Sequence, residues 1–279
     1  MPYNTLNSTS TTDSALTKQV TVKTLHKLKS NGEKFVVIAL YDAHMAAMAQ
    51  RCGVEVVLVG DSLGMTVLGY DSTIPVTMEH MIYHVEAVAR GNKKSLIIGD
   101  LPFMTYATPT DALRNAARIM QAGAQMVKLE GGEWLAETVH MLSERGIPVC
   151  AHLGLTPQSV NKLGGYRVQG RDQANAEKIL ADAKLLANAG ADLIVLECIP
   201  AALAAQITTA IHIPTIGIGA GKNTDAQVLV INDILGLTEQ PPTFSKNFLL
   251  EANDIPGAMQ KYVSDVKAGI FPGEENSFS

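Results

Sequence analysis

The segment AGAQMVKLE (122–130) recurs in a related form as AGADLIVLE (189–197). Each copy has a glycine that can close a helix, a short turn, an apolar run of strand length and an acidic residue at its end. This order of features is typical of one β/α unit of a barrel. A looser copy, GVEVVLVGD, occupies residues 53–61. The repeat indicates architecture, and by itself it says nothing about function.

Eight short apolar runs extend this pattern along the chain. They are rich in Val, Ile and Leu and do not alternate with polar residues, as expected for parallel strands that are buried on both faces. Most of the gaps between them hold helical patterns, such as residues 108–123. Strands that alternate with helices in this way predict an α/β fold, a single (β/α)8 TIM barrel, with a doubly wound open sheet as the alternative. The runs are KFVVIALYD (34–42), VEVVLVGD (54–61), KSLIIGDLP (94–102), AQMVKLEGG (124–132), IPVCAHLG (147–154), ADLIVLECIP (191–200), IPTIGIGAG (213–221) and the weaker QVLVIND (227–233).

The two ends of the chain differ from this central pattern. Residues 1–20 are rich in Ser and Thr and contain no Arg, and we expect a flexible N-terminal extension there. Residues 21–279 are predicted to form one barrel domain, and 241–269 within it read as one or two amphipathic C-terminal helices outside the barrel. These helices are expected to serve packing or oligomer formation rather than to form a second domain.

Composition restricts the class of protein. The 279 residues are 47% hydrophobic and 18% charged, a globular balance that excludes a disordered chain. The net charge of −5, without a basic block, argues against nucleic acid or an anionic membrane as a partner. Cys52, Cys150 and Cys198 lie in apolar segments without a CxxC motif, which is typical of reduced core thiols. No uncharged apolar run reaches the roughly 18 residues of a membrane span, and residues 1–20 resemble neither a signal nor a transit peptide, so we expect a soluble, cytoplasmic protein.

Acidic side chains follow several of the predicted strands at the point where each strand ends. In a barrel the carboxyl ends of the strands surround the mouth of the active site. A single acid at such a position is usually a solvated loop residue or a helix cap, whereas four of them behind buried runs favour a shared polar site. We call Asp61, Asp100, Glu130 and Glu197 the strand-end acids, and His152 lies at the end of another run.

Clustered carboxylates repel one another unless they are protonated or bound to a cation. Because the cluster offers oxygen ligands and no pair of His or Cys, Mg²⁺ is favoured over zinc. Mg²⁺ keeps waters and accepts substrate oxygens, so it suits a chelating ligand such as a 2-oxo acid, whose enolate it would stabilise as a Lewis acid. Lys128 lies two residues before Glu130 and therefore on the same strand face. It either neutralises the acids or contacts the substrate anion.

Two glycine-rich motifs are weaker signals. GIGAG (217–221) resembles half of a dinucleotide fingerprint, but the more frequent reason for such glycines is close approach of the backbone to a ligand or a neighbouring strand. GGYRVQGR (164–171) is either a mobile cover for the mouth or a plain surface loop. His44 and His84 lie on helical patterns and are interpreted as structural.

Longer strings in the chain resemble the ketopantoate hydroxymethyltransferase family, also called 3-methyl-2-oxobutanoate hydroxymethyltransferase. The likeness extends from about residue 21 to PGEE (272–275), and strings of this length are far more specific than a short motif. The link TEQPP (238–242) departs from the pattern expected for the family. The matching strings are VGDSLGMTVLGYDSTIPVT (59–77), DLPFMTYATP (100–109), MVKLEGGEW (126–134), AHLGLTPQSVNKLGGYRVQGR (151–171), LIVLECIP (193–200) and IGIGAG (216–221).

The resemblance implies a barrel of the phosphoenolpyruvate/pyruvate type, one Mg²⁺ ion, and transfer of a hydroxymethyl group from 5,10-methylenetetrahydrofolate to 3-methyl-2-oxobutanoate. The product would be ketopantoate (2-dehydropantoate), a precursor of pantothenate and coenzyme A, and the assembly a decamer of two pentameric rings. By matching position, the implied metal ligands are Asp61, Asp100 and Glu130. The oxo acid would be held by Asp61, Ser62, Asp100 and Lys128. Glu197 matches the catalytic base.

The chemistry of the residues agrees with these implied roles. The C3 proton of a branched 2-oxo acid is weakly acidic, so its removal needs charge withdrawal at the ketone, which a cation and Lys128 would supply. An apolar setting strengthens a carboxylate as a base, and LIVL and CIP flank Glu197. His152 is a possible auxiliary that moves a proton or orients a ligand, and it ranks second to Glu197.

Two alternatives compete with this interpretation. The first is a magnesium-dependent lyase or mutase that acts on another 2-oxo acid, but such lyases commonly carry a reactive cysteine in a mobile loop, and no cysteine here lies in a polar loop. The second is a non-catalytic metabolite-binding barrel, which would be indicated by loss of the base or of a metal ligand. Neither is lost in this sequence.

Overall fold

The central element of the fold is a closed barrel of eight parallel strands. A computed structural model describes residues 16–279, and in it each strand pairs with the next along the chain while β1 also pairs with β8. Each predicted run contributes one strand, so the predicted barrel is confirmed and the open sheet is excluded. The strands are β1 (Phe35–Ala39), β2 (Val56–Val59), β3 (Leu96–Asp100), β4 (Met126–Glu130), β5 (Val149–Gly154), β6 (Leu193–Glu197), β7 (Thr215–Ile218) and β8 (Ala226–Val230).

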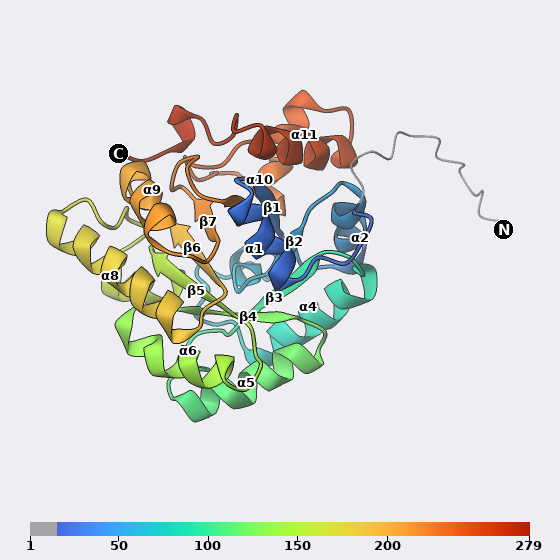
Figure 1. The fold of residues 1–279 in the computed structure, drawn as a ribbon. Coiled ribbons are helices and arrows are strands. Elements are labelled where there is room, and N and C mark those ends of the chain that lie inside the picture. The colour runs from blue at the N-terminus through green and yellow to red at the C-terminus, as the bar shows by residue number, and fades with distance from the viewer. Residues whose placement is uncertain (1–15) are drawn as a thin grey trace.

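A ring of helices surrounds the strands (Figure 1). The longer helices are α2 (Ala43–Arg51), α4 (Met78–Gly91), α5 (Pro109–Gln121), α6 (Ala136–Ser143), α8 (Gln173–Ala189), α9 (Ala201–Ala210) and α11 (Ile255–Lys267). Short helices lie in the connections: α3 (Leu63–Thr66), α7 (Val160–Leu163), α10 (Ile231–Ile234) and the 3₁₀ turns η1 (Glu133–Leu135), η2 (Pro157–Ser159), η3 (Phe248–Glu251) and η4 (Glu274–Asn276).

Local sequence signals set the limits of these helices. The hydroxyl of Thr108 accepts a hydrogen bond from the backbone N–H of Asp111, and Pro109 occupies the first turn, so α5 begins where its cap and its proline predict. The helix α8 begins at the Asp172 cap and ends at Gly190, whose φ of 108° a residue with a Cβ rarely adopts.

Alternation along each strand divides the core into two parts. In β4, Val127 and Leu129 pack outward among the residues that face the helices, whereas Met126 lies with the residues that fill the barrel interior. Because side chains alternate across a strand, Lys128 and Glu130 share the interior face with Met126. The predicted common face of Lys128 and Glu130 is therefore confirmed.

The N-terminal segment closes the bottom of the barrel. Leu25 on α1 (Val22–Ser30) and Val20 pack with the interior cluster. The backbone N–H of Val20 donates to the carbonyl of Lys94, and the Lys94 ammonium donates to the carbonyl of Leu16. Of the N-terminal extension predicted over residues 1–20, residues 1–15 lie outside the described residues, whereas residues 16–20 are attached to the barrel by these contacts.

The C-terminal helices pack against the outside of the barrel beside β1, and the helical prediction for 241–269 is confirmed. Tyr262 of α11 is fully buried, packs edge-on against Phe248 and Phe271, and its hydroxyl donates to the carbonyl of Val37. The three cysteines are buried and form no disulfide, as predicted. Within residues 16–279, no helix combines the length and the hydropathy that a membrane crossing needs.

Candidate active site

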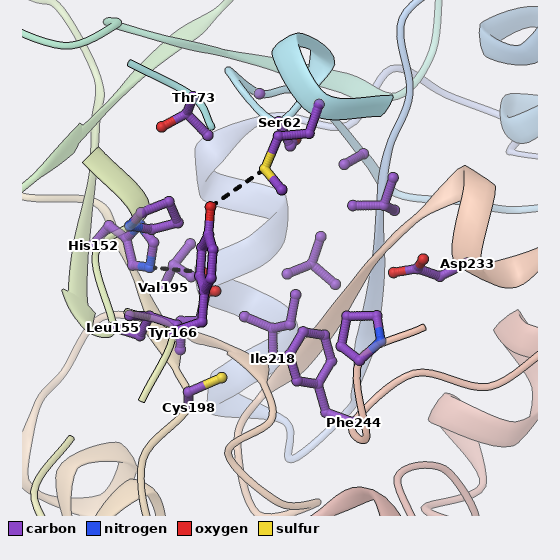
Figure 2. A pocket seen from close by; sticks show the side chains of 18 of the residues that line it. Ser62, Thr73, His152, Leu155, Tyr166, Val195, Cys198, Ile218, Asp233 and Phe244 are labelled. Atoms are coloured by element: carbon purple, nitrogen blue, oxygen red, sulfur yellow. Dashed lines mark hydrogen bonds and ion pairs between the residues drawn. The ribbon is translucent and has the colours of Figure 1, made fainter. Parts of the chain in front are cut away.

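A cavity of about 600 Å³ opens at the carboxyl ends of the strands, where the fold predicts a site. It is lined by all seven residues that the sequence singled out, namely the strand-end acids together with Ser62, Lys128 and His152. Figure 2 shows His152 on one side of this cavity and the Tyr166 ring projecting into it. The structure therefore brings all seven residues together around one cavity.

Strand register places several of these side chains side by side. Asp100 of β3 pairs with Lys128 of β4. Glu130 in turn pairs with His152 of β5, and Gly154 pairs with Glu197 of β6. The acids of successive strands therefore form one continuous polar layer at the mouth.

Lys128 lies between two of the acids. Its Nζ is 2.9 Å from Asp100 Oδ2 and 3.5 Å from Glu130 Oε1, and 5% of its side chain is exposed. Burial alone would lower the pKa of Lys128, but the carboxylates of Asp100, Glu130 and Asp61 outweigh it and raise that pKa well above its usual value. Lys128 therefore stays charged, and it neutralises part of the negative charge of Asp100 and Glu130.

Asp61 is held by backbone and amide contacts. Its N–H donates to Asp100 Oδ2 (3.1 Å), and its Oδ2 accepts a hydrogen bond from the side-chain amide of Gln158 (2.8 Å). Burial, together with the charges of Asp100 and Glu130, raises the pKa of Asp61 well above its usual value. Burial raises the pKa of Asp100 in the same way. Negative charge is therefore in excess around Asp61.

His152 connects two acids. Its Nδ1 lies 3.2 Å from Glu130 Oε1, and its Nε2 lies 3.2 Å from Glu197 Oε2, a contact at ion-pair distance that is not aligned as a hydrogen bond. Burial disfavours the charged ring, but the charge of Glu130 and the contacts with Glu130 and Glu197 raise the pKa of His152 to about 9. At neutral pH His152 is an imidazolium. Burial would raise the pKa of Glu130, but the charge of Lys128, followed by the charge and hydrogen bond of His152, outweighs burial and lowers that pKa.

The backbone around Glu197 is set by close approach of two strands. The carbonyl of Glu197 accepts a hydrogen bond from the N–H of Leu155 at 2.8 Å. Gly154, at a φ of 93°, lies so close that a Cβ there would overlap this carbonyl oxygen. Glu197 keeps 14% of its side chain exposed and lines the cavity. The flanking sequence predicted an apolar setting, and the contact with His152 is a polar feature that it did not predict.

A family model described as ketopantoate hydroxymethyltransferase matches residues 19–274. The chain belongs to the ketopantoate hydroxymethyltransferase family. Curated relatives named 3-methyl-2-oxobutanoate hydroxymethyltransferase agree: one from Saccharophagus degradans is 73% identical over 96% of this chain and 99% of its own length, and one from Cronobacter sakazakii is 56% identical over 94% and 99%. The protein is therefore an enzyme of the hydroxymethyltransferase class.

Solved structures share the barrel fold. Phosphonopyruvate hydrolase superposes with a TM-score of 0.59 at 13% identity, covering 78% of this chain and 84% of that one. For 2,3-dimethylmalate lyase, a member of the phosphoenolpyruvate mutase/isocitrate lyase superfamily, the TM-score is 0.56 at 16% identity, over 75% and 80%. At these identities the likeness shows the fold alone, and it is the fold that the family resemblance implied.

Family membership and the site disfavour the two alternatives. Cys198 lines the cavity, but burial, with the nearby charge of Glu197, raises the pKa of its thiol, so it lacks the thiolate character of a reactive lyase cysteine. No matched acid, lysine or base of the hydroxymethyltransferase is replaced, which argues against a merely binding barrel.

Several site residues were missed by reasoning from sequence. The backbone N–H of Gln158 donates to Glu130 Oε2 (3.0 Å), and its side-chain oxygen accepts from the hydroxyl of Tyr106 (2.5 Å). The hydroxyls of Tyr41 and Ser62 lie 2.9 Å apart. Gln158 and Tyr106 fall inside the strings that carry the family resemblance, which is the signal that could have found them.

The two glycine-rich motifs border the same cavity. Tyr166 and Val168 of GGYRVQGR line it, and the Tyr166 hydroxyl contacts the sulfur of Met65 at 3.5 Å (Figure 2). This position favours a cover over a plain surface loop. In GIGAG, a Cβ on Gly219 would approach the rings of Phe244 and Phe278 within about 3 Å, so the glycine serves close approach rather than dinucleotide binding.

Proposed function

We propose that this protein transfers a hydroxymethyl group from 5,10-methylenetetrahydrofolate to 3-methyl-2-oxobutanoate in a magnesium-dependent reaction that forms ketopantoate. The observation that carries the proposal is the buried layer of strand-end acids, with Glu197 facing the cavity, in a chain of this family. A proton acceptor, a lysine and oxygen ligands for a cation are the groups that enolisation of a 2-oxo acid requires.

The residues present fit a magnesium ion. Burial and the neighbouring carboxylates of Asp100 and Glu130 raise the pKa of Asp61 well above its usual value even with Lys128 beside them, and a divalent cation would relieve this excess of negative charge. In addition, Asp100 Oδ1 is buried and has no hydrogen-bond partner among residues 16–279. Such an orphaned acceptor is costly unless a ligand satisfies it.

The fit is that of an ion shared with substrate and water. Within the described part of the chain, no three His, Cys, Asp or Glu side chains converge closely enough to enclose an ion by themselves. This arrangement suits Mg²⁺, which commonly takes one or two protein carboxylates and completes its shell with waters and ligand oxygens. Asp61, Asp100 and Glu130 would hold it, in part through the waters of its shell. When bound, Mg²⁺ supplies Lewis-acid polarisation of the ketone oxygen.

Glu197 is the group positioned to take the C3 proton. It faces the cavity from the end of β6, and the contact between its Oε2 and His152 fixes its direction. The His152 imidazolium, anchored on its other side by Glu130, orients Glu197. Lys128 adds positive charge beside Asp100, where negative charge develops as the ketone becomes an enolate.

The reaction balances with these groups and water. Glu197 takes the proton from C3, and the C3 carbon forms a bond to the methylene carbon of the folate. Both bonds from that carbon to the folate nitrogens are broken, and a water oxygen bonds to the carbon as the hydroxyl. The proton taken by Glu197 and one proton of the water pass to those two nitrogens, and tetrahydrofolate leaves. The cytoplasmic location and the decamer stay predictions.

Deuterium exchange tests the proposal. The protein is incubated with 3-methyl-2-oxobutanoate in D₂O, with Mg²⁺ or with a chelator, and exchange at C3 is followed by NMR. We expect metal-dependent exchange without folate, and ketopantoate once methylenetetrahydrofolate is added. Exchange no faster than in a protein-free control would contradict the proposal. Metal-dependent exchange without ketopantoate would point to a different second substrate.

A further inference from the structure

The part of the cavity away from the strand-end acids has a different chemistry. Its wall contains Ile218, Val230, Phe244 and Phe278, and it carries a single buried acid, Asp233, on the short helix α10 that follows β8. Figure 2 shows Asp233 across the cavity from His152, with its carboxylate toward the space and with Ile218 and Phe244 between them in the view. None of these residues has a role in the steps assigned above.

Asp233 has an unused acceptor oxygen. Only 7% of the residue is exposed, and its Oδ1 accepts a hydrogen bond from the hydroxyl of Thr238 at 2.5 Å. Among residues 16–279, no Lys, Arg or His lies within ion-pair distance of it, and its Oδ2 accepts no hydrogen bond. Burial raises the pKa of Asp233, against the opposing effect of Thr238. A largely buried carboxylate whose free oxygen opens onto the cavity is placed to accept hydrogen bonds from a ligand with N–H donors.

Asp233 belongs to the same reaction space as the acids. Asp233 lines the same cavity as Asp61, Ser62 and Asp100, the residues that would hold the oxo acid. A ligand on Asp233 would therefore bind within reach of the oxo-acid side.

The oxo acid cannot be the ligand of Asp233. It carries acceptor oxygens and a negative charge, which a second carboxylate would repel, and it is too small to fill a cavity of about 600 Å³. A pterin ring offers the complement, because its N3–H and 2-amino group form two parallel donors that match a carboxylate in the manner of a guanidinium. Its flat faces suit apolar and aromatic walls such as Ile218 and Phe244.

We propose that Asp233 binds the N3–H and 2-amino edge of the pterin ring of the folate donor, with Phe244 and Ile218 against its faces. This inference rests on the proposed function and deepens it. Asp233 then separates the two substrates: it accepts the donor-rich ring on its side of the cavity and rejects the anionic oxo acid.

The test measures binding of tetrahydrofolate by calorimetry to wild type and to Asp233→Asn. The substitution keeps the size of the side chain but removes the charge and presents donors to donors, so the affinity should fall about 10- to 100-fold. The KM for methylenetetrahydrofolate should rise by a similar factor, whereas the KM for the oxo acid should stay within about twofold. Glu239→Gln is the matched control, because Glu239 is an exposed acid in the link that follows α10 and does not line the cavity, and the affinity of this variant should equal that of wild type.

A change in the ligand guards against a variant that fails to fold. A tetrahydrofolate whose 2-amino group is replaced by methyl should bind wild type about tenfold or more weakly than tetrahydrofolate, and Asp233→Asn should discriminate much less between the two. Equal binding of both ligands by wild type, or unchanged affinity in Asp233→Asn, overturns the assignment. Metal-dependent C3 exchange in wild type, measured without folate, distinguishes the two proposals. If exchange occurs, the proposed oxo-acid chemistry holds even when the pterin assignment fails. If exchange does not occur, both proposals are contradicted.

Discussion

Replacing Lys128 by Met tests the charge balance of the site most directly. Methionine keeps most of the stem of the side chain but removes the ammonium that lies 2.9 Å from Asp100 Oδ2 and 3.5 Å from Glu130 Oε1. Removal of one partner from a buried ion pair costs about 3–5 kcal/mol, because the remaining charge is left uncompensated. For a domain of this size, 1 kcal/mol shifts the melting temperature by about 2–4 °C, so the variant should melt about 6–20 °C below wild type.

Thermal unfolding with and without Mg²⁺ measures this change. Saturating Mg²⁺ should restore part of the lost stability, because it returns positive charge to the same acids. Lowering the pH should also reduce the loss of stability. Without the Lys128 ammonium the pKa values of the neighbouring carboxyls rise in the folded state, and a carboxyl whose pKa is raised by folding favours the folded state as the pH falls. Lys178→Met is the matched control, since this lysine is 60% exposed and its ion pair with Asp182 is worth at most about 1 kcal/mol.

Kinetics separate the two roles of Lys128. If it also contacts the substrate anion, oxo-acid binding should weaken and C3 exchange should slow. A lower melting temperature with normal exchange kinetics would leave only the neutralising role. A melting temperature equal to that of wild type would refute the argument from the buried ion pair.

Three further predictions follow from the site. Glu197→Gln should still bind Mg²⁺ and the oxo acid, but C3 exchange and ketopantoate formation should both fall by about two to four orders of magnitude; exchange at the wild-type rate in this variant would make His152 the leading candidate for the base. Gly154→Ala should lose most C3 exchange, because the new Cβ would overlap the Glu197 carbonyl. The control Gly146→Ala has a φ of 75° and open space around it, so it should lower the free energy of unfolding in urea by only about 1–2 kcal/mol and keep its activity. In chelator-treated enzyme the raised pKa values of Asp61 and Asp100 make these two carboxyls bind more protons in the folded state than in the unfolded chain, so their contribution to stability should fall as the pH rises from about 4. Mg²⁺ should reduce this loss, and stability profiles that run parallel with and without Mg²⁺ would argue against a cation at these acids.

Much of the fold and part of the site were predictable from local sequence. Runs such as LIIGD and LIVLE determine strands because a segment that is apolar on both faces must be buried between helices and a barrel interior. The period of two placed Lys128 with Glu130, and the acid at the end of each run located the mouth. The strings of the hydroxymethyltransferase family then assigned roles to residues that composition alone left open.

Only the tertiary structure decided which side chains meet. Gln158 bridges Asp61 and Glu130, and Asp233 faces the cavity from α10, the short helix that follows β8. The contact of His152 with Glu197 likewise depends on the register of β5 and β6. A strand pattern states which residues share a face, but closure of the barrel sets the stagger between strands and so selects the partner across them. For that reason the sequence alone determined a barrel with acids at its mouth, and the closed sheet determined how those acids are paired, oriented and charged.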